Sequence, residues 1–162
     1  MSSINIHSSS ANFKKMVIWD EAMKKEDREK KVDSLRKVAI LVIEDEEDLS
    51  NLLSDVLTHE GHEVETAPNG IQGIEVFEKK EFDMVFTDLG MPGISGWQVA
   101  EKVKSINGRV PVALITGWAT ELNQSEMKDS CLDILINKPF EIKQIINLVQ
   151  EGMILRERFN KV

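Results

Sequence analysis

Four short apolar runs in this sequence end at, or are followed by, side chains that can bind or transfer charged groups. Glu44 and Asp45 follow VAILVI, Asp88 follows FDMVFT, Thr116 ends VALIT and Lys138 follows LDILIN. Taken singly, each has an ordinary structural explanation: an acidic run favours the positive end of a helix, and an Asp before a Pro/Gly turn is common. Together they offer three carboxylates, a hydroxyl and an ammonium group, which suit metal binding and phosphoryl transfer.

The chemistry follows from charge. Three carboxylates crowded together repel one another unless a cation neutralises them. Oxygen-only ligands favour a hard ion, and Mg²⁺ is the natural candidate. A metal held beside a free carboxylate suggests phosphoryl transfer onto that carboxylate, with Asp88 attacking phosphorus. Lys138 would then offset the developing charge, and Thr116 would donate to a phosphoryl oxygen.

These residues can act together only if the fold brings them to one place. Apolar runs predict five strands, at residues 38–43, 62–67, 82–87, 111–115 and 132–137. Helical spacing predicts a helix after each strand, weakest over 121–130. This alternation predicts an α/β fold, a doubly wound parallel sheet with helices on both faces. No GxGxxG follows the first strand, and the length favours the flavodoxin-like strand order 2-1-3-4-5. In that order, strands 1, 3, 4 and 5 end along one continuous edge.

Composition limits the other classes of function. The chain has 162 residues, 41% hydrophobic and 30% charged, which is typical of a soluble globular protein. A net charge of −8 argues against nucleic acid as the partner of this domain. The single cysteine, Cys131, indicates a reducing compartment. No apolar run approaches transmembrane length, so we expect a cytoplasmic protein without a membrane partner.

The first part of the chain differs from the rest. Residues 1–37 form an N-terminal extension that we expect to be disordered at its Ser-rich start and then helical. Acids precede lysines by four positions, as in Asp20 and Lys24, which is the favourable order for pairs on a helix surface. Glu26 and Lys30 interrupt the apolar seam that Met16, Trp19 and Met23 begin, which favours a solvated helix over a dimerisation helix. We expect the globular domain over residues 38–155, and the end of the last helix with a tail over 156–162.

Four motifs resemble those of the receiver domain of bacterial two-component response regulators, the CheY-like family. They are ILVIEDEEDL, TDLGMPGISG, LITG and NKPF. All four in this order and at these spacings are highly specific, and the resemblance extends from about Val38 to about Met153. It implies that Asp88 is phosphorylated and that Thr116 and Lys138 bind the phosphoryl group. The Mg²⁺ ligands it implies are Glu44 through a water, Asp45, Asp88 and the backbone carbonyl of Gly90. It also implies a cis Lys138–Pro139 peptide.

The resemblance implies partners as well as chemistry. The domain would take its phosphoryl group from a histidine kinase or a histidine phosphotransfer protein and lose it by hydrolysis. It would catalyse only these two reactions of its own and would not be an enzyme in the usual sense. Nothing after the last helix is long enough for an output domain. We therefore expect signalling by contact with an unknown downstream protein, or a chain cut from a larger one.

The sequence departs from the family pattern at Glu44, at Cys131, which stands where Gly usually precedes the last strand, and at Leu135. Glu44 replaces the commoner Asp. Leu135 stands where receivers usually carry the Tyr or Phe that changes rotamer on phosphorylation, so the sequence does not predict this switch here. Two alternatives remain: a haloacid-dehalogenase-like phosphatase, which carries its nucleophile after the first strand, and a scaffold that does not depend on phosphorylation. His59 and His62 flank Gly61, away from this edge, and are predicted to be surface residues.

Overall fold

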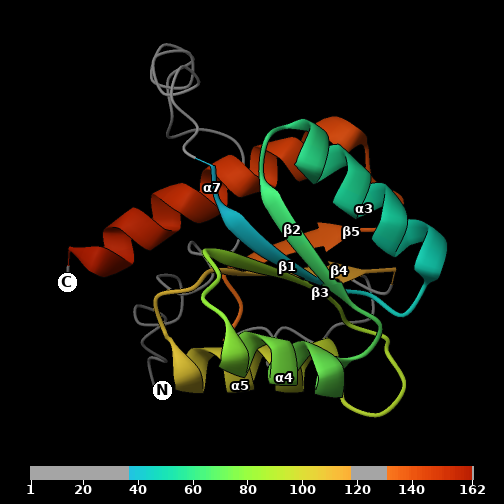
Figure 1. Ribbon diagram of the computed structural model, residues 1–162, viewed down its shortest axis with the longest axis horizontal. Coiled ribbons are helices and arrows are strands. Elements are labelled where there is room, and N and C mark those ends of the chain that lie inside the picture. The colour runs from blue at the N-terminus through green and yellow to red at the C-terminus, as the bar shows by residue number, and fades with distance from the viewer. Residues whose placement is uncertain (1–36, 118–130, 162) are drawn as a thin grey trace, which may run out of the picture. The chain divides into compact units, whose positions relative to one another are not determined.

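A computed structural model of the chain describes residues 37–117 and 131–161. Five parallel strands of these residues form one sheet in the order β2-β1-β3-β4-β5 (Figure 1). The strands are β1 Ala39–Ile43, β2 Glu63–Ala67, β3 Met84–Asp88, β4 Val112–Thr116 and β5 Ile134–Asn137. The predicted flavodoxin-like fold class and strand order are confirmed.

Helices cover both faces of the sheet. They are α3 Glu47–His59, α4 Gly70–Lys79, α5 Gly96–Ile106 and α7 Ile142–Asn160. α3 and α7 lie on one face, and α4 and α5 lie on the other (Figure 1). Every residue of β3 and β4 is buried, because these strands are covered on both sides. This explains why their sequences are nearly continuous apolar runs.

Successive residues of β1 pack alternately into the two apolar clusters on either face of the sheet. Ile40 and Val42 belong to the apolar cluster under α3 and α7. Leu41 and Ile43 belong to the cluster under α4 and α5. Full burial of an aliphatic side chain of this size contributes about 1.5–3 kcal/mol. The two clusters together therefore hold the strand ends rigidly in register.

The observed strands begin one or two residues later than predicted. The difference is clearest at Phe82, which was expected to open a strand, whereas β3 begins at Met84. Phe82 instead stacks on Phe77 with ring centroids 6.1 Å apart. Its carbonyl accepts a hydrogen bond from Arg156 Nη1 at 3.0 Å. Contacts from two helices therefore replace the first part of the predicted strand.

Of the two histidines predicted to lie at the surface, His59 is exposed, but His62 is buried, so the prediction was wrong for His62. The residue directly precedes β2 and is 5% exposed, and its Nδ1 atom has no hydrogen-bond partner within the described part of the chain. His62 and Val64 share one face of the extended chain, and Val64 packs against the cluster under α3 and α7. This two-residue period was the signal that could have placed His62 inside.

The predicted helix over 121–130 and the extension before residue 37 lie outside the described residues. Within the residues that are described, no helix is both long and apolar enough to span a membrane.

Candidate functional site

The register of the strands brings the predicted site residues to one edge. Ile43 pairs with Thr87, so Glu44 follows β1 next to the end of β3. Thr116 pairs with Asn137, so Lys138 follows β5 next to the end of β4. The backbone N–H of Lys138 donates to the Thr116 carbonyl at 2.8 Å. The hydrogen-bonded ladder thus extends one residue past the strand and places Lys138 beside the site.

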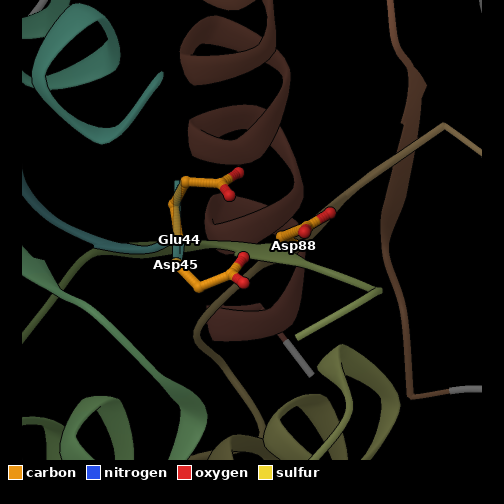
Figure 2. A group of neighbouring side chains, drawn as sticks. All are labelled: Glu44, Asp45 and Asp88. Atoms are coloured by element: carbon orange, nitrogen blue, oxygen red, sulfur yellow. The ribbon is translucent and has the colours of Figure 1, made fainter. Parts of the chain in front are cut away.

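Three carboxylates gather at this edge. One ligand oxygen from each of Glu44, Asp45 and Asp88 lies within 4.8 Å of the others. Figure 2 shows the three side chains as neighbours at the ends of β1 and β3. Glu44 and Asp88 are buried, whereas Asp45 is exposed. The group therefore combines two desolvated carboxylates with one that faces solvent.

Lys138 is the ammonium partner of the two buried acids. Its Nζ atom lies 3.3 Å from Glu44 Oε2 and 3.5 Å from Asp88 Oδ1. The side chain of Lys138 is 26% exposed, compared with 1% for Glu44 and 10% for Asp88. One positive charge faces three negative ones at this site. The residual negative charge favours a cation there.

The surroundings of Glu44 shift the pKa of its carboxyl. Burial raises the pKa of its carboxyl above the ordinary value of 4.5, and the negative charge of Asp88 raises it further. The backbone N–H of Glu46, which donates to Glu44 Oε1 at 3.1 Å, lowers the pKa, as does Lys138. The net shift is upward because desolvation is the largest of these effects. A second cation would favour the ionised form.

The other two predicted site residues, Thr116 and Gly90, differ in their surroundings. Thr116 is the last residue of β4 and is fully buried. Gly90 is exposed in the loop that follows β3, two residues after Asp88. The Lys138–Pro139 peptide is cis, as the resemblance implied.

The start of α5 holds the backbone of Asp88 in place. Gly96, the first residue of α5, packs so closely that a Cβ there would collide with the Asp88 carbonyl oxygen and with Leu114. Its N–H donates to the Leu89 carbonyl at 3.2 Å. The helix begins here because Ser95 and Gln98 form a capping box. Gly96 was not among the predicted site residues, although it lies within the TDLGMPGISG motif.

The donor set fits a hard divalent cation. All three side chains offer oxygen, which Mg²⁺ prefers, and the closeness of the carboxylates needs a counter-charge beyond Lys138. A buried carboxylate beside an ammonium group and a metal site is an arrangement that can attack phosphorus. The roles of the individual residues remain predictions.

Comparisons with known proteins agree with this geometry. The profile of the family described as response regulator receiver domain matches residues 40–150. The response regulator TrrA of Thermotoga maritima, solved in complex with Mg²⁺–BeF, is 30% identical, with a TM-score of 0.65 over 72% of this chain and 98% of that one.

This chain matches two further relatives over different shares of their own length. The transcriptional regulatory protein RprY of Bacteroides fragilis is 29% identical over 80% of this chain and 55% of its own length. Sporulation initiation phosphotransferase F of Bacillus subtilis is 27% identical over 72% of this chain and 94% of its own length. The chain spans about half the length of the transcriptional regulators it matches.

Proposed function

This chain belongs to the response regulator receiver domain family, and from that premise we propose that Asp88 accepts a phosphoryl group in a two-component phosphorelay. The observation that carries the proposal is the position of Asp88. Its carboxylate is buried at the end of β3, 3.5 Å from the Lys138 ammonium group and beside two further carboxylates. Among the described residues, no second group of three or more acidic side chains lies this close together.

Each residue then has a defined task. An Asp88 oxygen attacks the phosphorus of a phosphohistidine, a P–O bond forms, the P–N bond breaks and the imidazole leaves. Lys138 neutralises charge that develops on the phosphoryl oxygens, and the Thr116 hydroxyl donates to one of them. Water later attacks phosphorus, which restores the carboxylate and releases inorganic phosphate.

The proposal includes Mg²⁺. Asp45, Asp88 and the Gly90 carbonyl would hold the ion, with Glu44 acting through water. When bound, the ion supplies positive charge for the phosphoryl oxygens and offsets the repulsion between the carboxylates. The donor oxygens within 4.8 Å support this part of the proposal, as does the similarity to TrrA, which was solved with Mg²⁺–BeF.

The partners proposed are a histidine kinase or a histidine phosphotransfer protein as donor and a downstream protein as target. The match to nearly the whole of a sporulation initiation phosphotransferase supports a donor of this class. The cytoplasmic location stays a prediction from the sequence. A haloacid-dehalogenase-like phosphatase would carry its nucleophile after the first strand, whereas Asp88, which pairs with Lys138, is the last residue of β3. Turnover of a generic phosphatase substrate would favour that alternative.

The test uses acetyl phosphate as a small phosphodonor. Intact-mass measurement should show one added phosphoryl group on the wild type in the presence of Mg²⁺, and none in excess chelator. Asp88→Asn should not be labelled. The matched control is Asp48→Asn, an exposed acid in the acidic run that follows β1, which should be labelled like the wild type. Labelling of Asp88→Asn would contradict the proposal. In a separate test, normal binding of Asp88→Asn to its partner would favour a scaffold that does not depend on phosphorylation.

A further inference from the structure

The loop of residues 89–95, between β3 and α5, carries Gly90 and is fixed at both ends. At its start, the backbone N–H of Leu89 donates to the Ile115 carbonyl of β4 at 2.9 Å. At its end, the N–H of Gly96 donates back to the Leu89 carbonyl at 3.2 Å. The two ends are therefore tied to the sheet and to each other. If the loop moves, the residues that move must therefore lie between Leu89 and Gly96.

Two apolar side chains seat the middle of the loop. Met91 is buried in the cluster under α4 and α5, and Ile94 packs against the same cluster. Pro92 and Gly93 between them are exposed, and Gly93 turns the chain with φ +88. Gly90 directly precedes Met91. The position of the Gly90 backbone therefore depends on how these two side chains sit.

Ile94 sits where a side chain of residue 70 would lie. Gly70 is the first residue of α4 and is buried. A Cβ built on Gly70 would be 2.5 Å from Ile94 Cγ1, 2.9 Å from Ile94 Cδ1 and 2.9 Å from Val99 Cγ2. Gly70 does not have a positive φ, so its conformation does not require glycine. The requirement comes from the space that Ile94 occupies.

We propose that Gly70 is a positioning residue for the candidate Mg²⁺ site, because the space it leaves open seats Ile94 and, through Ile94, the loop that carries Gly90. The inference rests on the function proposed above, since Gly90 matters as a ligand only if the chain binds Mg²⁺. It assigns a role to the start of α4, which contributes no residue to the predicted site.

Gly70→Ala tests the inference. The new methyl group would meet Ile94 at Cγ1, next to the branched carbon, where little rotation can relieve the contact. Ile94 must then move and carry the loop with it, because the loop ends are tied. Mg²⁺ tolerates little distortion of its octahedral ligand set. We expect the affinity for Mg²⁺ to fall about tenfold, equivalent to about 1.4 kcal/mol. The helix itself should not suffer, since Ala is the better helix former.

Two measurements on the full-length chain report the effect. Isothermal titration calorimetry with MgCl₂ gives the affinity, and amide hydrogen exchange of residues 90–95 in the metal-free protein reports the loop. Exchange in this loop should be faster in Gly70→Ala. The matched control is Gly152→Ala in α7, where a Cβ would be 2.5 Å from Met84 Sδ at the opposite end of β3. That variant should keep the wild-type Mg²⁺ affinity and the wild-type exchange in the loop.

A second variant separates contact with Ile94 from a general loss of stability. Ile94→Ala removes both of the Ile94 atoms that the new methyl group would meet. Gly70→Ala should therefore cost less Mg²⁺ affinity in the Ile94→Ala background than in the wild type. Additive effects would overturn the inference, because residues that act through one contact are not additive.

The outcomes also distinguish this inference from the proposed function. A wild type that neither binds Mg²⁺ nor is labelled by acetyl phosphate would overturn the proposed function and this inference with it. If the wild type binds and is labelled, but Gly70→Ala binds Mg²⁺ as tightly as Gly152→Ala, the proposed function stands and the role of Gly70 is rejected.

Discussion

The ammonium group of Lys138 lies between two buried carboxylates, 3.3 Å from Glu44 and 3.5 Å from Asp88. It is their nearest positive charge in the described structure. A metal ion at the same carboxylates would compete with Lys138 for their oxygens. The same ammonium group is proposed to stabilise the transferring phosphoryl group. Replacing Lys138 should therefore have opposite effects on Mg²⁺ affinity and on the rate of phosphorylation.

Lys138→Met should bind Mg²⁺ more tightly and be phosphorylated more slowly. The carboxylates lose their competing cation, so the affinity should rise about fivefold, the equivalent of roughly 1 kcal/mol for a partly exposed ion pair. Labelling by acetyl phosphate should slow because the phosphoryl oxygens lose a charged partner. Calorimetry with MgCl₂ and intact-mass kinetics measure the two effects. Lys143→Met, at an exposed position of α7, is the control. Weaker Mg²⁺ binding would show that Lys138 supports the site rather than competing for it.

His62 makes the stability of the domain depend on pH. Burial lowers its pKa below the ordinary value of 6.5, and the negative charge of Glu60 offsets only part of this. The unfolded chain, where the pKa is close to 6.5, therefore binds a proton at a higher pH than the folded chain does. The contribution of His62 to stability is present above pH 6.5 and is lost as the pH falls toward the lower pKa of the folded state.

His62→Leu should remove this part of the pH dependence. Urea unfolding at about pH 7.5 and about pH 5.5 gives the change in the free energy of unfolding with pH. The wild type should lose more stability between these values than His62→Leu does. His59→Gln, at the exposed end of α3, should behave like the wild type. Equal losses in the wild type and His62→Leu would mean that other groups account for the acid sensitivity.

At the scale of elements, a mostly buried ion pair joins α5 to β4 and β5. Lys104 Nζ of α5 lies 2.5 Å from Asp133 Oδ2, which directly precedes β5, and their side chains are 15% and 12% exposed. The same Asp133 oxygen accepts from the N–H of Val112, the first residue of β4, at 2.8 Å. Lys104 also lies over the ring of Phe159, near the end of α7, at 5.0 Å. The carboxylate thus links α5 to the sheet, and the Lys104 ammonium group adds a contact with α7 in the other layer.

Asp133→Ala should destabilise the domain by about 3 kcal/mol, since the mostly buried ammonium group loses its carboxylate and the Val112 N–H loses its acceptor. Lys104 Nζ would keep only its hydrogen bonds to the carbonyls of Val110 and Gly108. The matched control is Glu78→Ala. Glu78 of α4 pairs with Lys102 of α5 at 3.4 Å, but the side chains are 48% and 47% exposed. Its loss should cost less than about 1 kcal/mol, as is usual for surface pairs. Urea unfolding of both variants measures the difference. Equal costs would contradict the assignment of this pair as a structural link.

At the scale of the whole molecule, both apolar clusters of the described structure are formed by residues between Val38 and Leu155. The domain bounds of 38–155 stay a prediction from the sequence. The N-terminal extension has no long apolar face in its sequence, since Glu26 and Lys30 interrupt the seam of Met16, Trp19 and Met23. We therefore propose that the extension adds little to the stability of the domain.

A chain beginning at Arg36 should melt at nearly the same temperature as the full-length chain. The reason is that the residues removed contribute no extended apolar surface to bury. Thermal unfolding followed by circular dichroism measures the difference, and light scattering of both chains checks the oligomeric state. A large fall in melting temperature, or a change from dimer to monomer, would show that Met16, Trp19 and Met23 are packed.

Much of the fold and of the site could be predicted from sequence alone. Buried parallel strands such as 112–116 are recognisable because both of their faces must be apolar, so they form nearly continuous apolar runs. Once the strand order is known, residues that follow the strands must meet at one edge. Asp88, Thr116 and Lys138 could therefore be selected by type and by position, although they are far apart in the chain.

The contacts between residues that are far apart in the chain could be known only from the tertiary structure. Glu44 and Asp45 are adjacent, yet Glu44 is buried against Lys138 and Asp45 is exposed, because successive residues leave an extended chain on opposite sides. The burial of His62 and the fit of Ile94 over Gly70 depend in the same way on where a helix or a loop from another part of the chain comes to lie. Apolar periodicity identifies which face of an element is covered, whereas the side chain that covers it depends on packing between elements.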